Sequence, residues 1–396
     1  CIRDSSKALE LAKITSDTPN PPLGSIDKDP VSGEPTGYLS EAGMGLVGKL
    51  LDRAQPETYQ QAMKRSLNEM QAWGVTSFID MMVNTEVIDA YYSLLEQEQL
   101  PFRVNTAFAM NEYTAEVMTA DEAKSLLPEA VKRTSDRINT NNFKYWGDGT
   151  PLSYTSLLVD KYADKDTYGE MTMSDEMRED AINYLGQGIN GHIHTITDGS
   201  IRYVLDLVEE AREQYPGKVN RFHMGHCSLI HPDDYQRFID LDVVAEIGPA
   251  MWYPSPVKLL VEEKLGVERA KNWFNIRAML DAGITIAWGS DWPAGTPDAN
   301  PFRGLEGLIT RSHPWGEEEG SWGTPISMEE GLQILTMGGA YAMQREGEIG
   351  SIEVGKYADM IVLDNNLFEI DPAEISDIAV DTSIFNGKVA YEKGEE

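Results

Sequence analysis

Residues 283–293, GITIAWGSDWP, decide the fold. The segment ITIAW is apolar and rich in β-branched residues, so it predicts a buried strand. A Gly-Ser pair ends this strand, and the carboxylate of Asp291 follows directly. Barrels of parallel strands carry their chemistry at the carboxyl ends of the strands, which makes Asp291 a candidate catalytic residue. On this stretch alone, an Asp291 that only caps the following loop is an equal alternative.

Six further stretches upstream have strand character, and they alternate mostly with amphipathic helices. The expected strands are residues 75–82, 102–109, 142–146, 189–196, 220–227 and 243–247. The expected helices are residues 55–73, 86–97, 120–132, 175–187, 200–214, 232–240 and 270–281. Such alternation implies a parallel sheet, and its usual closed form is the TIM (β/α)8 barrel. Seven strands leave this barrel one short, and the missing strand would precede residue 75.

The two ends of the chain differ in sequence pattern from its middle. Residues 1–55 contain several Pro and Gly residues and no strand pattern, so we predict a helical and loop insertion there. A long helix is expected from Met328 to about Arg345. Residues 346–396 contain short β segments with glycine turns and predict the C-terminal part of a small β-sandwich domain. The expected fold class is therefore α/β, with a barrel over residues 1–345 that lacks its first strand in the numbered chain.

The composition limits the classes of partner. The 396 residues include 33 basic and 65 acidic side chains, which gives a formal net charge of −32. This charge argues against nucleic acid or an anionic membrane surface. No apolar run approaches the ~18 residues that a membrane span requires. The two cysteines, Cys1 and Cys227, are too few for a disulfide framework and leave a cytoplasmic or a periplasmic location open.

Side chains suited to metal binding stand at the ends of four expected strands. They are Lys144, His194, His226 and Asp291. Imidazole and carboxylate are ligand types that suit zinc. Each residue alone has a structural explanation, such as a hydrogen-bonded histidine or a lysine that reaches solvent. Their joint placement in one barrel favours a metal site.

Four of the six histidines fall in two of the expected strands. Residues two apart face the same side of a strand, so His192 and His194 are both in reach of one metal. His223 and His226 are three apart, and we expect them to face opposite sides. Only one of this second pair should then point into the barrel.

Five motifs carry a family resemblance. They are FKYWGDGT (143–150), HTITDGSI (194–201), MGHCSLIHPDD (224–234), GSDWP (289–293) and GSIEVGKYADMIVLD (350–364). Together they resemble the amidohydrolase superfamily, in its amidohydrolase 3 (YtcJ-like) branch, which includes N-substituted formamide deformylase-like enzymes. Three positions depart from the family pattern: Thr197 replaces a glycine, Gly225 replaces a glutamate, and His192 stands where an apolar residue is usual. His192 is either an extra pocket group or a tolerated strand residue.

The resemblance implies a zinc-dependent hydrolase that acts on carbon–nitrogen bonds other than peptide bonds. Lys144 would be carbamylated and would bridge two metals, and His194 and His226 would bind the second metal. Asp291 would bind the first metal and act as general base and acid for a metal-bound hydroxide. One or two divalent cations per chain, a small amide-type substrate and a homodimer, the common assembly of the family, are the further expectations.

The family also places a His-x-His pair after its first strand, and no such pair precedes His192. The simplest explanation is that Cys1 is not the biological start, which agrees with the missing strand. A rival placement uses His192 and His194 as this pair, but it leaves too little chain for eight strands. Two other functions compete with the hydrolase: a catalytically degenerate barrel that acts as a binding protein, and an enzyme with Cys1 as nucleophile.

Substrate clues come from aromatic and basic residues near the last two expected strands. The aromatic residues are Trp252, Tyr253, Trp273, Trp288, Trp292 and Trp315. They predict an aromatic, rather apolar pocket, with Trp252 and Trp292 as candidates for substrate contact, although core packing explains several of them equally well. For Arg311 and His313 we expect salt bridges with the acidic surface, with an anionic substrate group as the alternative.

Overall fold

The computed structural model describes most of the chain. The described residues are 2–3, 5–21, 24–51, 55–111, 118–248, 256–294, 296, 298–314 and 323–394. Four residues with predicted roles, Cys1, Trp252, Tyr253 and Trp315, lie outside them.

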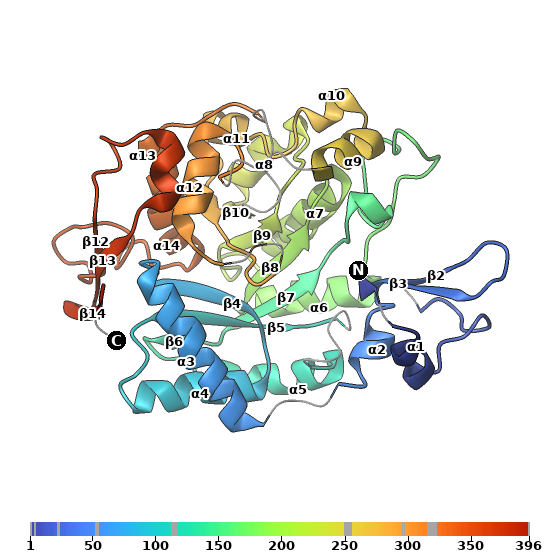
Figure 1. Ribbon diagram of the computed structural model, residues 1–396, viewed down its shortest axis with the longest axis horizontal. Coiled ribbons are helices and arrows are strands. Elements are labelled where there is room, and N and C mark those ends of the chain that lie inside the picture. Colours follow the sequence, from blue (N-terminus) through green and yellow to red (C-terminus); the bar gives the residue numbers. More distant parts are fainter. Residues whose placement is uncertain are drawn as a thin grey trace.

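A curled parallel sheet forms the centre of the molecule (Figure 1). Its strands, in spatial and chain order, are β4 (Ser77–Val83), β5 (Arg103–Ala109), β7 (Asn142–Trp146), β8 (Asn190–Thr195), β9 (Phe222–His226), β10 (Val243–Ile247) and β11 (Ile286–Trp288). The two-residue strand β6 (Ile138–Asn139) pairs with β5. The seven predicted strands and the α/β barrel class are confirmed. Among the described strands β4 and β11 do not pair, so the barrel is open between them.

Helices cover the outside of this sheet. The helices that were predicted are α3 (Pro56–Ala72), α4 (Thr85–Glu96), α5 (Ala120–Val131), α6 (Asp175–Gly186), α7 (Asp198–Gln214), α8 (Tyr235–Asp240) and α11 (Ile276–Ala282). The predicted long helix after Met328 is interrupted: α13 (Met328–Gln333) passes through a π-helical turn (Ile334–Gly338) into α14 (Gly339–Ala342). None of the described helices is both long enough and apolar enough to cross a bilayer.

Three helices were not predicted from the sequence. They are α9 (Pro256–Leu265), α10 (Val267–Ala270) and α12 (Pro301–Thr310). In α12, two glycines weaken the intrinsic helix propensity. Its buried residues Phe302, Leu305 and Leu308 instead stabilise the helix through packing, a tertiary effect that outweighs propensity.

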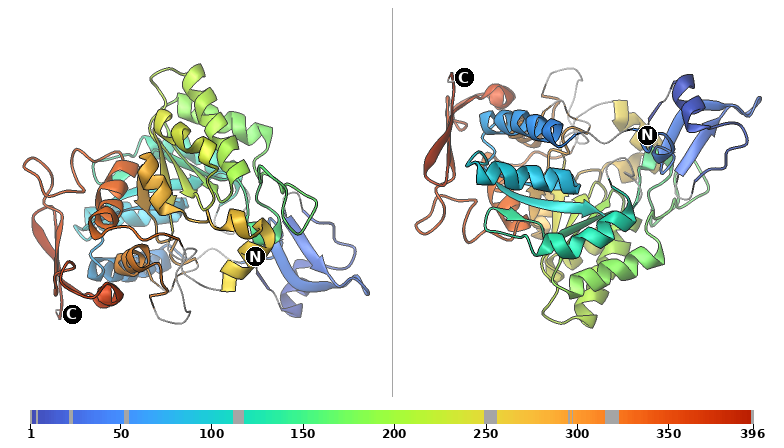
Figure 2. Two further views of the ribbon diagram at one scale, coloured as in Figure 1. Left: turned by 90° about the horizontal axis from the view of Figure 1, so that it is seen from above. Right: turned by 90° about the horizontal axis from the view of Figure 1, so that it is seen from below.

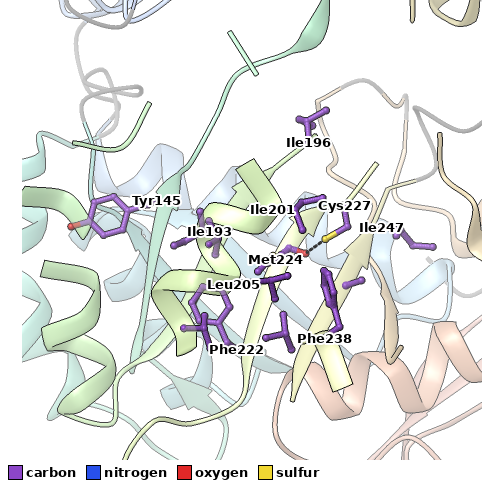
Figure 3. Close-up of a cluster of buried hydrophobic side chains, with 14 of the residues drawn as sticks. Tyr145, Ile193, Ile196, Ile201, Leu205, Phe222, Met224, Cys227, Phe238 and Ile247 are labelled. Atoms are coloured by element: carbon purple, nitrogen blue, oxygen red, sulfur yellow. Dashed lines mark hydrogen bonds between the residues drawn. The ribbon is translucent and has the colours of Figure 1, made fainter. Parts of the chain in front are cut away.

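The apolar core lies between the sheet and its helices (Figure 3). Ile193 in β8 and Met224 in β9 are fully buried members of this core. Each alternates along its strand with histidines, because neighbouring residues of a strand face opposite sides. The sheet therefore has an apolar outer face and a polar inner face. The thiol of Cys227 is buried in the same core, with its Sγ 3.6 Å from the carbonyl oxygen of Met224.

The prediction that residues 1–55 are helical and loop-like is corrected by an antiparallel sheet. Its strands β1 (Ile2–Arg3), β2 (Gly24–Lys28) and β3 (Pro35–Glu41) are accompanied by α1 (Ser6–Ala12) and α2 (Gly45–Gly48). The strands are short, and a small cluster around Ile26 and Leu39 is their apolar core. This leaves too few apolar residues for a recognisable alternation. The sheet contacts the barrel through Glu41, whose Oε1 accepts a hydrogen bond from Thr155 at 2.9 Å.

A second antiparallel sheet lies at the opposite end of the molecule (Figures 1 and 2). It consists of β12 (Met360–Leu363), β13 (Val380–Phe385) and β14 (Lys388–Glu392). A buried ion pair joins Arg103 of β5 to Asp359, and Ser383 donates a hydrogen bond to the carbonyl of Gln71 at the end of α3. The β segments expected after residue 346 are present, and their assignment to a β-sandwich domain stays a prediction.

Candidate metal centre and active site

The four residues predicted as metal ligands come from four strands and share one site. Lys144 lies in β7, His194 in β8 and His226 at the end of β9, while Asp291 follows β11 by three residues. The rings of His194 and His226 meet edge to face, with centroids 4.4 Å apart. The charges of Lys144 and Asp291 act on each other and on His226. The structure therefore brings the four side chains together, while their roles remain predictions.

All four strand histidines lie on the inner face, contrary to the expectation for His223 and His226. His223 contacts His192, with ring centroids 4.7 Å apart, just as His226 contacts His194. The reason is the backbone of His226, whose φ of 71° lies in the left-handed region. This turn at the strand end breaks the alternation and returns the side chain to the inner face. We call His194 and His226 the outer pair, because they lie nearer the carboxyl ends of β8 and β9, and His192 and His223 the inner pair, because they lie further inside these strands. Both pairs are on the inner face of the sheet.

Two of the candidate ligands hold an uncommon backbone conformation. Asp291, with φ 54°, is left-handed like His226. Non-glycine residues in this region carry strain, and such strain gathers at functional sites. At both positions the strained residue is one that the sequence motifs had already selected.

The electrostatics of the site suit metal ligation. Burial lowers the pKa of His194 well below its usual value, and burial also lowers the pKa of His226, so both imidazoles are neutral near pH 7. Burial likewise lowers the pKa of the Lys144 amine and raises the pKa of Asp291. The Nε2 atom of His194 is buried with no hydrogen-bond partner among the described residues. Neutral imidazoles, a carboxylate and an unpartnered buried nitrogen fit a zinc-type ion.

Asp148 is a site residue that the sequence interpretation missed. Its side chain is fully buried and accepts hydrogen bonds from the backbone N–H groups of Ile196 and Thr197. Its Oδ1 lies 3.7 Å from Nε2 of His194. Burial raises the pKa of Asp148 to about 7. The only signal in the sequence was its place in the Gly-Asp-Gly turn after the strand of Lys144.

Glu246 of β10 is a second residue that was missed. Its Oε2 lies 3.0 Å from Nε2 of His192 and 3.9 Å from Nδ1 of His223, so it joins the inner pair. Although burial opposes its ionisation, the hydrogen bond with His192 and the nearby imidazole of His223 hold the pKa of Glu246 well below the usual range. A glutamate inside the otherwise apolar strand VVAEI was the available signal.

A cavity of about 420 Å³ lies between β4 and β11. Its lining includes Thr76, Phe78, Glu246, Trp288, Ser290 and Phe302. The wall is mostly apolar and contains one of the predicted aromatic residues, Trp288. Because Glu246 forms part of this wall, the cavity reaches the inner face of the sheet.

The other aromatic and basic candidates have varied surroundings. Trp273 is buried and packs edge to face against Phe274, as core packing predicts. Trp292 stacks edge to face on Trp73, with ring centroids 6.0 Å apart, and its contact with substrate stays a prediction. Arg311 is only 1% exposed, so it is not the surface residue that was expected.

Comparisons with known proteins agree with the motifs. A family model described as "Amidohydrolase family" matches residues 1–391. YtcJ of Bacillus subtilis (strain 168), an amidohydrolase by its name, is 25% identical over 400 residues, which cover 99% of this chain and 72% of YtcJ. An N-substituted formamide deformylase of Arthrobacter pascens is 27% identical over 409 residues, which cover 98% of this chain and 71% of the deformylase. An uncharacterized metal-dependent hydrolase from Pyrococcus horikoshii OT3 shares the fold, with a TM-score of 0.71 at 22% identity over 93% of this chain and 70% of that chain.

Proposed function

The chain belongs to the amidohydrolase family, and we propose that it is a metal-dependent hydrolase that cleaves an amide-type carbon–nitrogen bond of a small molecule. The observation that carries this proposal is the outer pair, together with Lys144 and Asp291, at the carboxyl edge of the sheet. Four donor side chains from four strands converge there, which is where barrel enzymes place their chemistry. The binding of one or two zinc ions, carbamylation of Lys144 and the reaction itself are parts of this proposal.

The residues have distinct roles in the proposed site. The neutral imidazoles of His194 and His226 would hold the metal through their nitrogen lone pairs. A bound zinc ion supplies Lewis acidity, which polarises the substrate carbonyl and lowers the pKa of a water molecule toward neutrality. Lys144 reacts as a neutral amine: its Nζ forms a bond to the carbon of CO2 and releases a proton, which leaves an anionic carbamate as ligand. Burial favours this step because it lowers the pKa of the amine.

Asp291 is the residue that moves protons. As a carboxylate, it accepts a proton from the attacking water and delivers it to the leaving nitrogen. Burial raises the pKa of Asp291, which brings its basicity closer to the working pH. Amide and water are thereby converted to amine and carboxylic acid.

The test combines metal analysis with a substrate screen. The zinc-loaded protein is assayed for amine release from N-substituted formamides and from other small amides. The formamides are chosen because of the deformylase relative. We expect turnover that requires zinc. A zinc-loaded, folded chain that releases no amine from any of these substrates would instead support the degenerate, binding-only barrel.

Carbamylation has its own test. After incubation with ¹³C-bicarbonate, the parent chain should show a carbamate signal by NMR, and Lys144→Gln should not. The variant should also lose at least ~100-fold in turnover, because it lacks the anionic ligand. An identical carbamate signal in Lys144→Gln would assign the modification to another amine.

A further inference from the structure

The inner pair and Glu246 form a compact cluster that the proposed catalytic set does not use. His192, His223 and Glu246 come from the adjacent strands β8, β9 and β10. One ligand atom from each lies within 4.8 Å of the other two. The shortest separation is 3.0 Å, between Nε2 of His192 and Oε2 of Glu246. Ligand atoms around a tetrahedral zinc ion are separated by about 3.3 Å, so small side-chain adjustments suffice to surround one ion.

Two glycines provide the room for this cluster. A Cβ at Gly225 would lie 2.8 Å from Cε1 and 2.9 Å from Nε2 of His192. A Cβ at Gly289 would lie 2.2 Å from Oε1 of Glu246. Any other residue at either position would therefore displace a member of the cluster.

The two histidines keep unpartnered nitrogens in a buried position. His192 is 2% and His223 4% exposed, and the Nδ1 atom of each has no hydrogen-bond partner among the residues that the structure describes. The Nδ1 of His223 points toward Glu246 across 3.9 Å, which is too long for a hydrogen bond. Buried polar atoms without partners are costly and rare, so this gap needs an explanation. A shared metal ion that binds Nδ1 of His223, Nε2 of His192 and the carboxylate of Glu246 explains the unpartnered nitrogen of His223.

The cluster also borders a cavity. Glu246 lies in the wall of the cavity between β4 and β11. An ion can thus enter from this side, and a fourth ligand position can face the cavity. Two histidines, one glutamate and one open position are a ligand set that zinc uses in proteins.

We propose that His192, His223 and Glu246 bind an additional divalent cation of the zinc class, at a site that shares no ligand with the site of Lys144, His194, His226 and Asp291. The two sites share no residue. The inner site takes its ligands from within β8, β9 and β10, whereas His194, His226 and Asp291 of the outer site lie near or beyond the ends of their strands. Lys144 pairs in register with His192, so the two sites are neighbours in the same barrel.

Zinc binding to matched variants tests the proposal. Chelator-stripped full chain is dialysed against zinc chloride at a fixed free concentration, and bound zinc is counted by elemental analysis. Glu246→Gln and His223→Gln should each bind one zinc fewer than the parent. His231→Gln, which removes a histidine that lies outside both sites, should bind as many as the parent. If Glu246→Gln and His223→Gln, folded by circular dichroism, keep the parent's zinc count and affinity, the proposal is overturned.

A second measurement needs no substitution. Crystals of the parent chain, loaded with stoichiometric zinc before crystallisation, should give an anomalous zinc peak between His192 and Glu246. A peak at the outer site alone, or none, would overturn the inner site. If the inner peak is present but the chain releases no amine, this proposal stands and the proposed function is contradicted. Failure of the inner site and failure of the proposed function therefore give different results.

Discussion

The outer and inner pairs show how two positions along the same two strands give different chemistry. Each pair contacts its own carboxyl group, Asp148 for the outer pair and Glu246 for the inner pair. Burial raises the pKa of Asp148 to about 7. The hydrogen bond with His192 and the nearby imidazole of His223 instead keep Glu246 ionised, although burial opposes its ionisation. The two histidine pairs therefore differ in their electrostatics because different carboxyl groups, Asp148 and Glu246, lie next to them.

The largest effect is expected at the outer site. Asp291→Asn changes both a proposed ligand and the proposed proton acceptor, so turnover should fall by at least ~10³-fold. Steady-state kinetics on zinc-loaded protein measures this loss. Asp281→Asn, which only loses an exposed ion pair with Arg277, is the matched control and should keep the parent's rate. An Asp291→Asn variant within tenfold of the parent would remove Asp291 from the mechanism.

The carboxyl group beside the outer pair should make stability depend on pH. Because the pKa of Asp148 is raised from 3.8 to about 7, the folded state favours its protonated form. The stability that this provides is complete below about pH 3.8 and is lost as the pH rises through 7, a change of about 4 kcal/mol. In metal-free protein, Asp148→Asn should remove this contribution from the unfolding free energy measured between pH 4 and 8. A variant with the parent's pH dependence would show that Asp148 does not titrate in this range.

The smallest effect is expected at the inner site. Gly225→Ala places a methyl group against the ring of His192 and should lower the free energy of unfolding by about 1–3 kcal/mol. In a double-mutant cycle with His192→Ala, most of this cost should disappear, because the ring that collides is gone. Denaturant titration of the four proteins measures the coupling. Additive costs would mean that Gly225 is not needed to accommodate His192.

Regular parts of the fold were predictable from the sequence, and irregular parts were not. The strands of the barrel are short stretches in which apolar residues recur, and they lie mostly between amphipathic helices. Such local patterns depend little on the rest of the chain. The N-terminal sheet was missed because its three short strands are stabilised by pairing with each other, for instance Ile2 with Leu39. Helix α12 was missed because packing, not propensity, stabilises it.

The site was predictable where a motif marks it. Lys144, His194, His226 and Asp291 follow from strand ends and family motifs, and the structure brings them together. The orientation of His226 was not predictable, because one left-handed residue reverses the alternation of its strand. Glu246 and Asp148 were missed because their partners are on neighbouring strands, and the strand pairing that joins them is not local in sequence.

The left-handed backbone at His226 and Asp291 has an evolutionary consequence. A non-glycine residue pays about 1–2 kcal/mol to stay in this region, and glycine avoids most of that cost. Directed evolution that selects only for heat resistance should therefore enrich glycine at positions 226 and 291, and the winners should have lost their proposed ligands. Selection for thermal tolerance would then favour glycine at these two positions, whereas selection for turnover would favour histidine and aspartate.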